Sequence, residues 1–236
     1  MIYFLFDIET IKDYDLLEKA GSEKDKEKAD NGEFVNAVFH IPIAFSFMAF
    51  SERKLLGFKS YVGEERYIVK IFWEKVNKAF TCKEPGPVFV TFNGKNFDFP
   101  VMLLRGMKIK DDEIVKKALK YYLEDSDKWE KERPNYNSRY TRYHIDLMEV
   151  FNVRTSLKVL CSLFGIPVKT EAHGSEVEEL YRNKKFKKIA QYCAEDVLAT
   201  ARLFTVFTSM KTGQTFNFLR EKIDVKIINQ WSEEDS

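Results

Sequence analysis

Two carboxylates stand at alternate positions near the start of the chain, in the stretch YFLFDIET. Successive side chains of a strand point to opposite faces, so Asp7 and Glu9 would share one face with Tyr3 and Leu5. The intervening residues are also apolar, which is typical of a strand covered on both sides. Because a charge at the end of such a strand is costly without a compensating group, the two acids need a partner.

A third acid lies on the longest predicted helix, residues 184–210. At ~100° per residue, Asp196 projects near the edge of the apolar stripe of this helix, and Tyr192 lies one turn earlier on the same side. An acid on the core side of a helix also requires a partner.

A fourth acid, Asp98, follows the apolar run VFVTFN at a strand-to-helix junction, where open α/β sheets gather ligands. Each acid has an ordinary explanation when it is taken alone. Asp98 can cap the helix that contains Pro100, and Asn93-Gly94 can be only a turn. The two acids of the first strand can pair with arginines, and Asp196 can belong to a half-buried salt bridge.

One arrangement accounts for all four acids together. Carboxylate oxygens are hard ligands that suit Mg²⁺ or Mn²⁺, and two such ions close together can clamp a phosphodiester. In that scheme one ion lowers the pKa of a bound water, and the other stabilises the leaving 3′ oxygen. The four acids therefore indicate a two-metal site for phosphodiester hydrolysis.

The composition restricts the classes of function. The chain has 236 residues, 44% of them hydrophobic, which supports a sizeable core. Lys and Arg number 38 against 37 Asp and Glu, whereas a protein that binds nucleic acid by bulk charge would be far more basic. A phosphate-bearing ligand must therefore be met locally. The three cysteines include no CxxC pair, which argues against a disulfide framework and against a zinc site.

The start of the sequence and its hydropathy indicate where the protein works. Met1 leads directly into a predicted strand, without the basic and apolar regions of a signal peptide. No run reaches the roughly 20 apolar residues that cross a bilayer. We therefore expect a cytoplasmic protein that does not interact with membranes.

The patterns predict one α/β domain over residues 1–210 and a tail of unknown role at 211–236. Further strands are expected at residues 41–50, 51–62 and 85–93, and further helices at 11–20, 64–80, 156–165 and 175–183. Residues 21–34 are charged without apolar periodicity, so we expect a surface loop. Residues 124–143 are predicted to be a polar excursion from the core.

Three short segments resemble the exonuclease motifs of the DEDD superfamily. They are Asp7-Ile8-Glu9-Thr10, Asn93-Gly94-x-x-Phe97-Asp98-x-Pro100 and Tyr192-x-x-x-Asp196. More narrowly, the chain resembles stand-alone 3′–5′ exonucleases related to the proofreading domain of family B DNA polymerases. The histidine class would have His five residues before the last Asp, where this chain has Gln191, so it resembles the tyrosine (DEDDy) class.

The resemblance implies an α/β, RNase H-like fold with a central mixed five-stranded sheet flanked by helices. It also implies that two Mg²⁺ or Mn²⁺ ions are held by Asp7, Glu9, Asp98 and Asp196. We expect Tyr192 to position the attacking water, because a phenol with a pKa of about 10 is a poor base at neutral pH. The alternative for Tyr192 is a core position on an amphipathic helix.

The resemblance also implies contacts with the terminal nucleotide of the substrate. Asn93 is expected to bind its sugar, and the backbone near Ile8 and Thr10 is expected to meet the 3′-hydroxyl. Phe97 would pack on a base, although a core position is an equal alternative. Asp146 would be either a fifth ligand or, more in keeping with its position, a cap for the residues that follow it.

The predicted function is metal-dependent 3′–5′ exonuclease activity on single-stranded DNA, with release of nucleoside 5′-monophosphates. An exoribonuclease is an alternative, because the metal site reads only the phosphodiester and RNA is distinguished by contacts at the 2′ position. A non-catalytic nucleic-acid-binding module is an alternative from another class. DNA repair is one expected setting, with a separate replication or repair protein as a partner.

Overall fold

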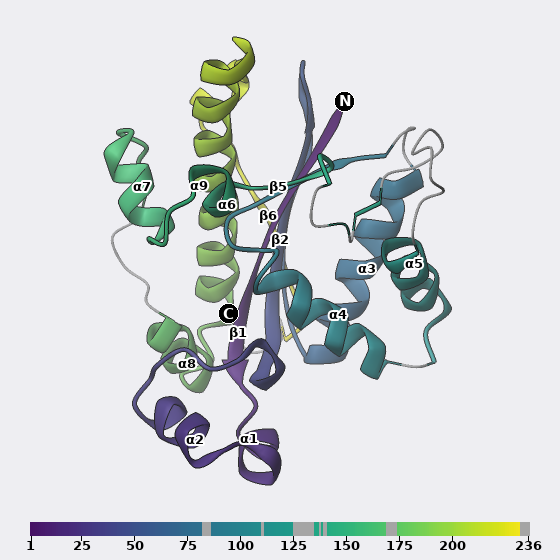
Figure 1. Cartoon of the computed structure of the whole chain (residues 1–236), viewed down its shortest axis with the longest axis vertical. Coiled ribbons are helices and arrows are strands. Elements are labelled where there is room, and N and C mark those ends of the chain that lie inside the picture. The colour runs from purple at the N-terminus through teal and green to yellow at the C-terminus, as the bar shows by residue number, and fades with distance from the viewer. Residues whose placement is uncertain are drawn as a thin grey trace.

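A mixed six-stranded sheet organises the chain (Figure 1). The computed structural model describes residues 1–81, 86–109, 111–124, 135–136, 138, 141–168 and 174–231. The strand order is β5-β4-β1-β2-β3-β6. The strands are β1 (Ile2–Lys12), β2 (His40–Ser51), β3 (Leu55–Val62), β4 (Val88–Thr91), β5 (His144–Asp146) and β6 (Lys226–Asn229).

Strand β1 lies inside the sheet, antiparallel to β2 and parallel to β4. Its pairing with β2 is regular as far as Glu9, which faces Ala44, and then shifts so that Thr10 faces Pro42. One residue of β2 is therefore extra, which is a β-bulge. Bulges occur next to active sites because they redirect side chains, and this one lies beside the acidic end of β1.

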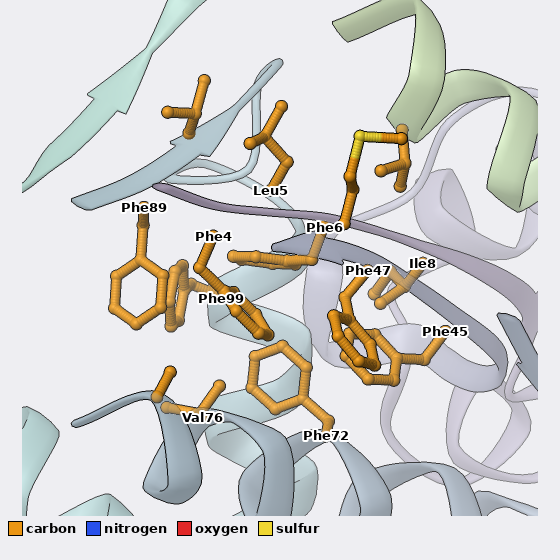
Figure 2. Close-up of a cluster of buried hydrophobic side chains, with 14 of the residues drawn as sticks. Phe4, Leu5, Phe6, Ile8, Phe45, Phe47, Phe72, Val76, Phe89 and Phe99 are labelled. Carbon is orange, nitrogen blue, oxygen red and sulfur yellow. The ribbon is translucent and has the colours of Figure 1, made fainter. Parts of the chain in front are cut away.

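One face of the sheet is covered by α3 (Glu65–Thr81) and α4 (Asp98–Lys108), and α5 (Glu113–Leu123) packs against these two helices. Figure 2 shows how Phe4, Phe6 and Ile8 of β1 point to this side. The ring of Phe6 meets Phe72 of α3 and Phe99 of α4 edge to face, at centroid distances of 5.3 Å and 4.9 Å. This packing fixes the strand that carries the first two acids.

The other face of the sheet is covered by the long helix α9 (Phe186–Thr212), which lies opposite α3 and α4 in Figure 1. Tyr3 of β1 packs against Phe204 of α9, with ring centroids 5.1 Å apart. The expectation that both faces of β1 are covered is confirmed. Because Asp7 shares the face of Tyr3, it lies on the α9 side of the sheet.

The remaining elements lie around this frame. They are α1 (Tyr14–Ala20), α2 (Glu23–Asp30), η1 (Ala37–Phe39), α6 (Leu147–Phe151), α7 (Leu157–Leu163), α8 (Gly174–Arg182) and η2 (Asn217–Arg220). Helices α1 and α2 lie together at one end of the molecule, at the bottom of Figure 1. No helix in the described part of the chain is long and apolar enough to span a bilayer.

Two expectations about the elements are wrong. The predicted surface loop at 21–34 contains helix α2, because Ser22 and Asp25 form a capping box and Ala29 on one face of the helix is buried. The sheet has six strands rather than five, because β6 from the predicted tail pairs in parallel with β3. Phe216, also from the tail, is buried against Tyr3. The division of the chain at residue 210 stays a prediction, and most of the excursion at 124–143 lies outside the described residues.

Candidate active site

Three of the four predicted acids meet between β1 and α9. One carboxylate oxygen from each of Asp7, Glu9 and Asp196 lies within 4.8 Å of the others. All three residues are half-buried, so the group is accessible from one side. The alternation of β1 and the turn of α9 that follows Tyr192 therefore bring together acids that lie far apart in the sequence.

Asp98 lies beside this group, at the first position of α4. Its Oδ1 accepts a hydrogen bond of 3.1 Å from the backbone N–H of Ile8, between the two acids of β1. The residue before α4 is Phe97, which makes no side-chain cap, so Asp98 is not the N-cap of this helix. Its carboxylate instead links α4 to the strand that carries Asp7 and Glu9.

Burial and repulsion from neighbouring acids raise the pKa of all four carboxylates. Burial raises the pKa of Asp7 and Glu9 well above the ordinary range, and repulsion from the neighbouring acids raises it further. Burial also raises the pKa of Asp98 to about 7 and that of Asp196 to about 6. Within the described residues, no lysine or arginine pairs with any of the four. The arginine and salt-bridge explanations therefore fail there, because no cationic side chain of the described residues balances the acids.

Cys193 of α9 forms a hydrogen bond with Asp7. Its Sγ donates to the backbone oxygen of Asp7 at 3.2 Å and lies 3.7 Å from Oδ2 of the same residue. Burial raises the pKa of the Cys193 thiol well above its usual value, so it remains a neutral donor. Helix α9 therefore contributes both an acid and a contact that restrains the first acid of β1.

Asp146 anchors the segment that leads into Asp98. Its Oδ1 accepts from the backbone N–H of Asn93 at 3.0 Å and of Met148 at 3.1 Å. Its Oδ2 accepts from the hydroxyl of Thr91 and the N–H of Lys95, both at 3.0 Å. Asp146 is the N-cap of α6, as expected, and each of its two carboxylate oxygens accepts two hydrogen bonds.

His144 completes this buried network. The hydroxyl proton of Thr91 goes to Asp146, so its oxygen accepts from the Nε2–H of His144 at 2.9 Å. Burial lowers the pKa of His144 to about 3, so the ring is neutral. These contacts are those of a hydrogen-bonded strand histidine rather than of a metal ligand.

The turn after β4 requires unusual backbone geometry. Asn93 has a φ of 64°, in the left-handed region that Asn tolerates better than most residues. A Cβ on Gly94 would lie only 2.6 Å from the side chain of Thr91, so only glycine fits. The N–H of Asn93 is directed to Asp146, and Asn93 is not among the residues that line the pocket described below.

A pocket of about 310 Å³ adjoins the acids on the other side of Glu9. Three of the four predicted substrate-contact residues, Ile8, Thr10 and Phe97, line it together with Glu9. The full lining is Ile8, Glu9, Thr10, Lys12, Gly32, Glu33, Phe34, His40, Phe97 and Glu178. Glu9 therefore belongs to both the acidic group and the pocket.

Tyr192 lies one turn before Asp196 and is half-buried, outside the buried core of the described residues. The Nζ of Lys188 lies 5.5 Å from the centroid of its ring. The ring also faces α8 across a small hollow whose lining includes Glu179 and Asn183. These positions argue against the core alternative, and the role of Tyr192 in positioning water stays a prediction.

Sequence reasoning missed the far wall of the pocket, which comes from the segment after α2 and from the first residue of β2. Phe34 and His40 form this wall, and Glu178 of α8 closes another side. The isolated aromatic residue in the charged stretch 21–34 was a signal that could have identified Phe34. Nothing in the local pattern indicated His40 or Glu178.

A family model described as a predicted 3′–5′ exonuclease related to the exonuclease domain of PolB matches residues 32–231. The family B DNA polymerase from the archaeon Pyrobaculum calidifontis is similar in structure, with a TM-score of 0.54 and 14% identity over 88% of this chain. This chain covers 24% of that polymerase. No curated protein sequence gives a significant match.

Exonuclease I structures are also similar. A complex titled ExoI/SSB-Ct matches 92% of this chain and 43% of its own with a TM-score of 0.41 and 13% identity. A product-bound exonuclease I matches 87% of this chain and 43% of its own with a TM-score of 0.39 and 14% identity. The similarity to the polymerase confirms the RNase H-like fold. Because the family model spans most of the sequence, the chain belongs to the predicted 3′–5′ exonucleases related to the exonuclease domain of PolB.

Proposed function

We propose that this exonuclease removes nucleotides one at a time from the 3′ ends of single-stranded DNA, with two Mg²⁺ or Mn²⁺ ions, and releases nucleoside 5′-monophosphates. One observation carries the proposal. The carboxylates of Asp7, Glu9 and Asp196 converge within 4.8 Å, next to Asp98, and no cationic side chain in the described residues pairs with them.

The donor set fits hard divalent cations. All four side chains offer carboxylate oxygens, which Mg²⁺ and Mn²⁺ prefer, and none of them offers the sulfur or nitrogen that favours zinc. The raised pKa values show that the folded chain holds this charge at a cost that a cation would offset. When bound, such ions supply Lewis acidity that activates water and stabilises charge on the phosphate and leaving oxygen.

The arrangement of the pocket and the acids supports cleavage at a strand end. Glu9 lines the 310 Å³ pocket and also belongs to the acidic group. A nucleoside in the pocket would therefore place its 5′ phosphate towards the other acids. The backbone of Ile8 and Thr10 would meet the terminal 3′-hydroxyl, and Phe97 would contact the base. Tyr192, one turn before Asp196, would orient the attacking water.

Asn93 takes a different part in this proposal from the one that its motif suggests. Its backbone N–H is used by Asp146, and its side-chain Oδ1 accepts from Asn96 at 3.3 Å. We therefore assign Asn93 to the turn that supports Phe97 and Asp98. The contact between the Asn93 side chain and the sugar stays part of the proposal.

The experiment is degradation of a short 5′-labelled strand, as DNA and as RNA of the same sequence, with Mg²⁺, with Mn²⁺ or with EDTA. We expect a ladder that shortens by one nucleotide at a time on DNA, only with metal, and a product that carries a 5′-phosphate. Faster loss of RNA would replace DNA by RNA in the proposal. Binding of intact strands without any cleavage would support the non-catalytic module and overturn the proposal.

Two variants make this assay specific for the acidic group. Asp7→Asn removes one of the proposed ligands while it keeps the shape of the side chain, and it should abolish the ladder. Asp224→Asn is the matched control, because its carboxylate is exposed and lies outside the acidic group. Full activity of Asp7→Asn would show that the acids do not hold the ions that act on the strand.

A further inference from the structure

Phe34 is unusual among the phenylalanines of the chain. Of the 21, all of which are described, only Phe34 and Phe164 are largely exposed, at 64% and 43%. A single exposed apolar side chain on a surface needs no explanation. Phe34 differs because its ring takes part in lining the pocket beside Glu9.

Phe34 belongs to a cluster of three rings at this pocket. Its ring centroid lies 5.2 Å from that of Phe97 and 5.5 Å from that of His40. The rings of His40 and Phe97 meet at right angles, 4.9 Å apart. All three residues line the same pocket. The cluster therefore presents aromatic faces to a cavity whose volume is at the lower end of the range for ligand pockets, which suits one nucleoside.

Hydrogen bonds fix His40 within this cluster. Its Nε2–H donates to the carbonyl oxygen of Val35 at 3.3 Å, and its Nδ1 accepts from the hydroxyl of Thr10 at 2.8 Å. The carbonyl oxygen of Val35 can only accept, so the proton of the neutral ring is on Nε2 and Nδ1 is the acceptor. Burial lowers the pKa of His40, which keeps the ring neutral. The residue next to Phe34 is thereby tied, through His40, to the strand that carries Glu9.

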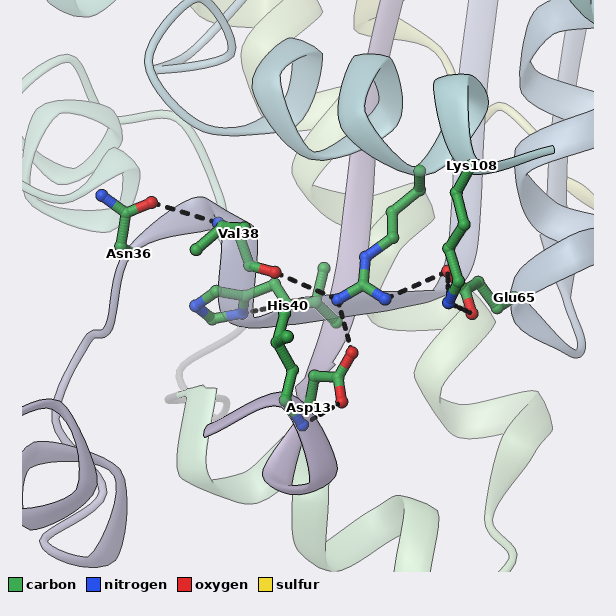
Figure 3. Close-up of polar contacts among 9 residues, drawn as sticks. Asp13, Asn36, Val38, His40, Glu65 and Lys108 are labelled. Atoms are coloured by element: carbon green, nitrogen blue, oxygen red, sulfur yellow. Dashed lines mark hydrogen bonds and ion pairs between the residues drawn. The ribbon is translucent and has the colours of Figure 1, made fainter. Parts of the chain in front are cut away.

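A buried arginine ties the same segment to the core. Arg105 of α4 is 5% exposed and donates to Oδ2 of Asp13 at 2.8 Å, the carbonyl of Val38 at 3.1 Å and Oε1 of Glu65 at 3.1 Å. Figure 3 shows these partners around the start of β2. Lys12 adds a contact from β1, because its Nζ donates to the carbonyl of Ala29 at 3.0 Å. The exposed ring of Phe34 therefore stands on a segment held at several points.

We propose that Phe34 is a substrate-binding residue whose ring stacks on the base of the 3′-terminal nucleotide, next to Phe97 in the pocket beside Glu9. The inference rests on the proposed function and adds a second residue that contacts the base. Every base has a π-face, so stacking on an aromatic ring is tolerant of sequence. Phe34 would therefore strengthen binding of any strand end without selecting a particular base.

The first test uses a strand with 2-aminopurine at its 3′ terminus, in metal-free buffer so that the strand stays intact. The wild-type chain should quench the fluorescence of the terminal base, because stacking on a ring quenches it. Phe34→Ala should lose most of the quenching and bind the strand roughly five- to a hundredfold more weakly, the range that corresponds to one base–aromatic stack. Phe34→Trp should keep both, and Phe164→Ala should behave as wild type.

The second test uses a strand whose terminal nucleotide lacks a base. Such a strand keeps its sugar and phosphates, so Phe34→Ala and the wild type should bind it equally. Equal binding of the normal strand by Phe34→Ala and the wild type would overturn the inference. So would a defect of the same size on the abasic strand, since that would indicate a structural role. A wild-type chain that neither binds nor cleaves strands would overturn the proposed function as well, which distinguishes the two failures.

Discussion

Replacing Asp98 by asparagine tests the electrostatics of the acidic group most sharply. The side chain is 4% exposed, and asparagine keeps the oxygen that accepts from the N–H of Ile8. The substitution therefore removes a charge and leaves the hydrogen bond. We expect the metal-free variant to be more stable than the wild type at pH 8, while its metal-dependent activity is lost.

The size of the effect follows from the pKa of Asp98. Burial, with repulsion from Asp146 and Asp196, raises it from 3.8 to about 7. A difference of one pKa unit corresponds to about 1.4 kcal/mol, so ionised Asp98 costs the folded state about 4 kcal/mol. The buried amide has its own cost of transfer from water, which offsets part of this. We expect the free energy of unfolding to rise by about 2 kcal/mol.

The dependence on pH gives the sign of this effect. The folded chain holds the proton of Asp98 more tightly than the unfolded chain, so the wild type loses stability as the pH rises from about 4 to about 7. The asparagine variant lacks this titration. The difference between the two should therefore be largest at pH 8 and should shrink towards pH 4.

Urea denaturation of both proteins in EDTA and in excess Mg²⁺ measures these quantities. Mg²⁺ at a hundred times its Kd would stabilise the wild type by about 2.7 kcal/mol, and the variant should gain much less. Asp224→Asn, an exposed substitution, should follow the wild type throughout. A variant that is less stable than the wild type in EDTA at pH 8, or that gains as much from Mg²⁺, would refute the reasoning.

Three further substitutions test the residues that support the site. Asp146→Asn replaces one acceptor oxygen by an amide N–H₂, which faces the buried donors of Thr91 or Lys95 without a hydrogen bond. The free energy of unfolding in urea should therefore fall by about 3 kcal/mol. An unchanged urea midpoint would contradict the anchoring role of Asp146. Arg105→Leu leaves Asp13 without its buried cation. The substitution should lower the free energy of unfolding by about 3 kcal/mol. It should also raise KM for a strand more than it lowers kcat, and an effect on kcat alone would count against the proposed pocket wall. Cys193→Ala should lower kcat with little change in KM, because it removes a contact with Asp7, and a change in KM alone would contradict this.

The parts of the fold that local patterns specify were predictable. Strand β1 is a continuous apolar run and helix α9 has an apolar face at helical spacing, and these patterns place Asp7 and Asp196 on facing surfaces. Helix α2 escaped prediction because its residues are almost all charged and only Ala29 is buried. Strand β6 escaped because its pairing partner, β3, lies far away in the sequence and no local pattern reports such pairing.

The candidate site also has parts that the sequence predicts and parts that it does not. The acids could be predicted because their types and motif spacing carry the chemistry. The pocket wall could not, because Phe34 and His40 reach Phe97 only through the contacts of Arg105 and Lys12, which depend on the tertiary fold. For Asn93 the structure shows that its N–H supports a turn through Asp146, and its contact with the sugar stays a prediction.

Crystals grown with Mn²⁺ and a short single strand would test the central claim most directly, since anomalous scattering locates the metal. We expect manganese peaks among the carboxylates of Asp7, Glu9 and Asp196, with the 3′-terminal nucleotide in the pocket beside Glu9. A strand bound elsewhere, with no manganese among these carboxylates, would contradict the claim.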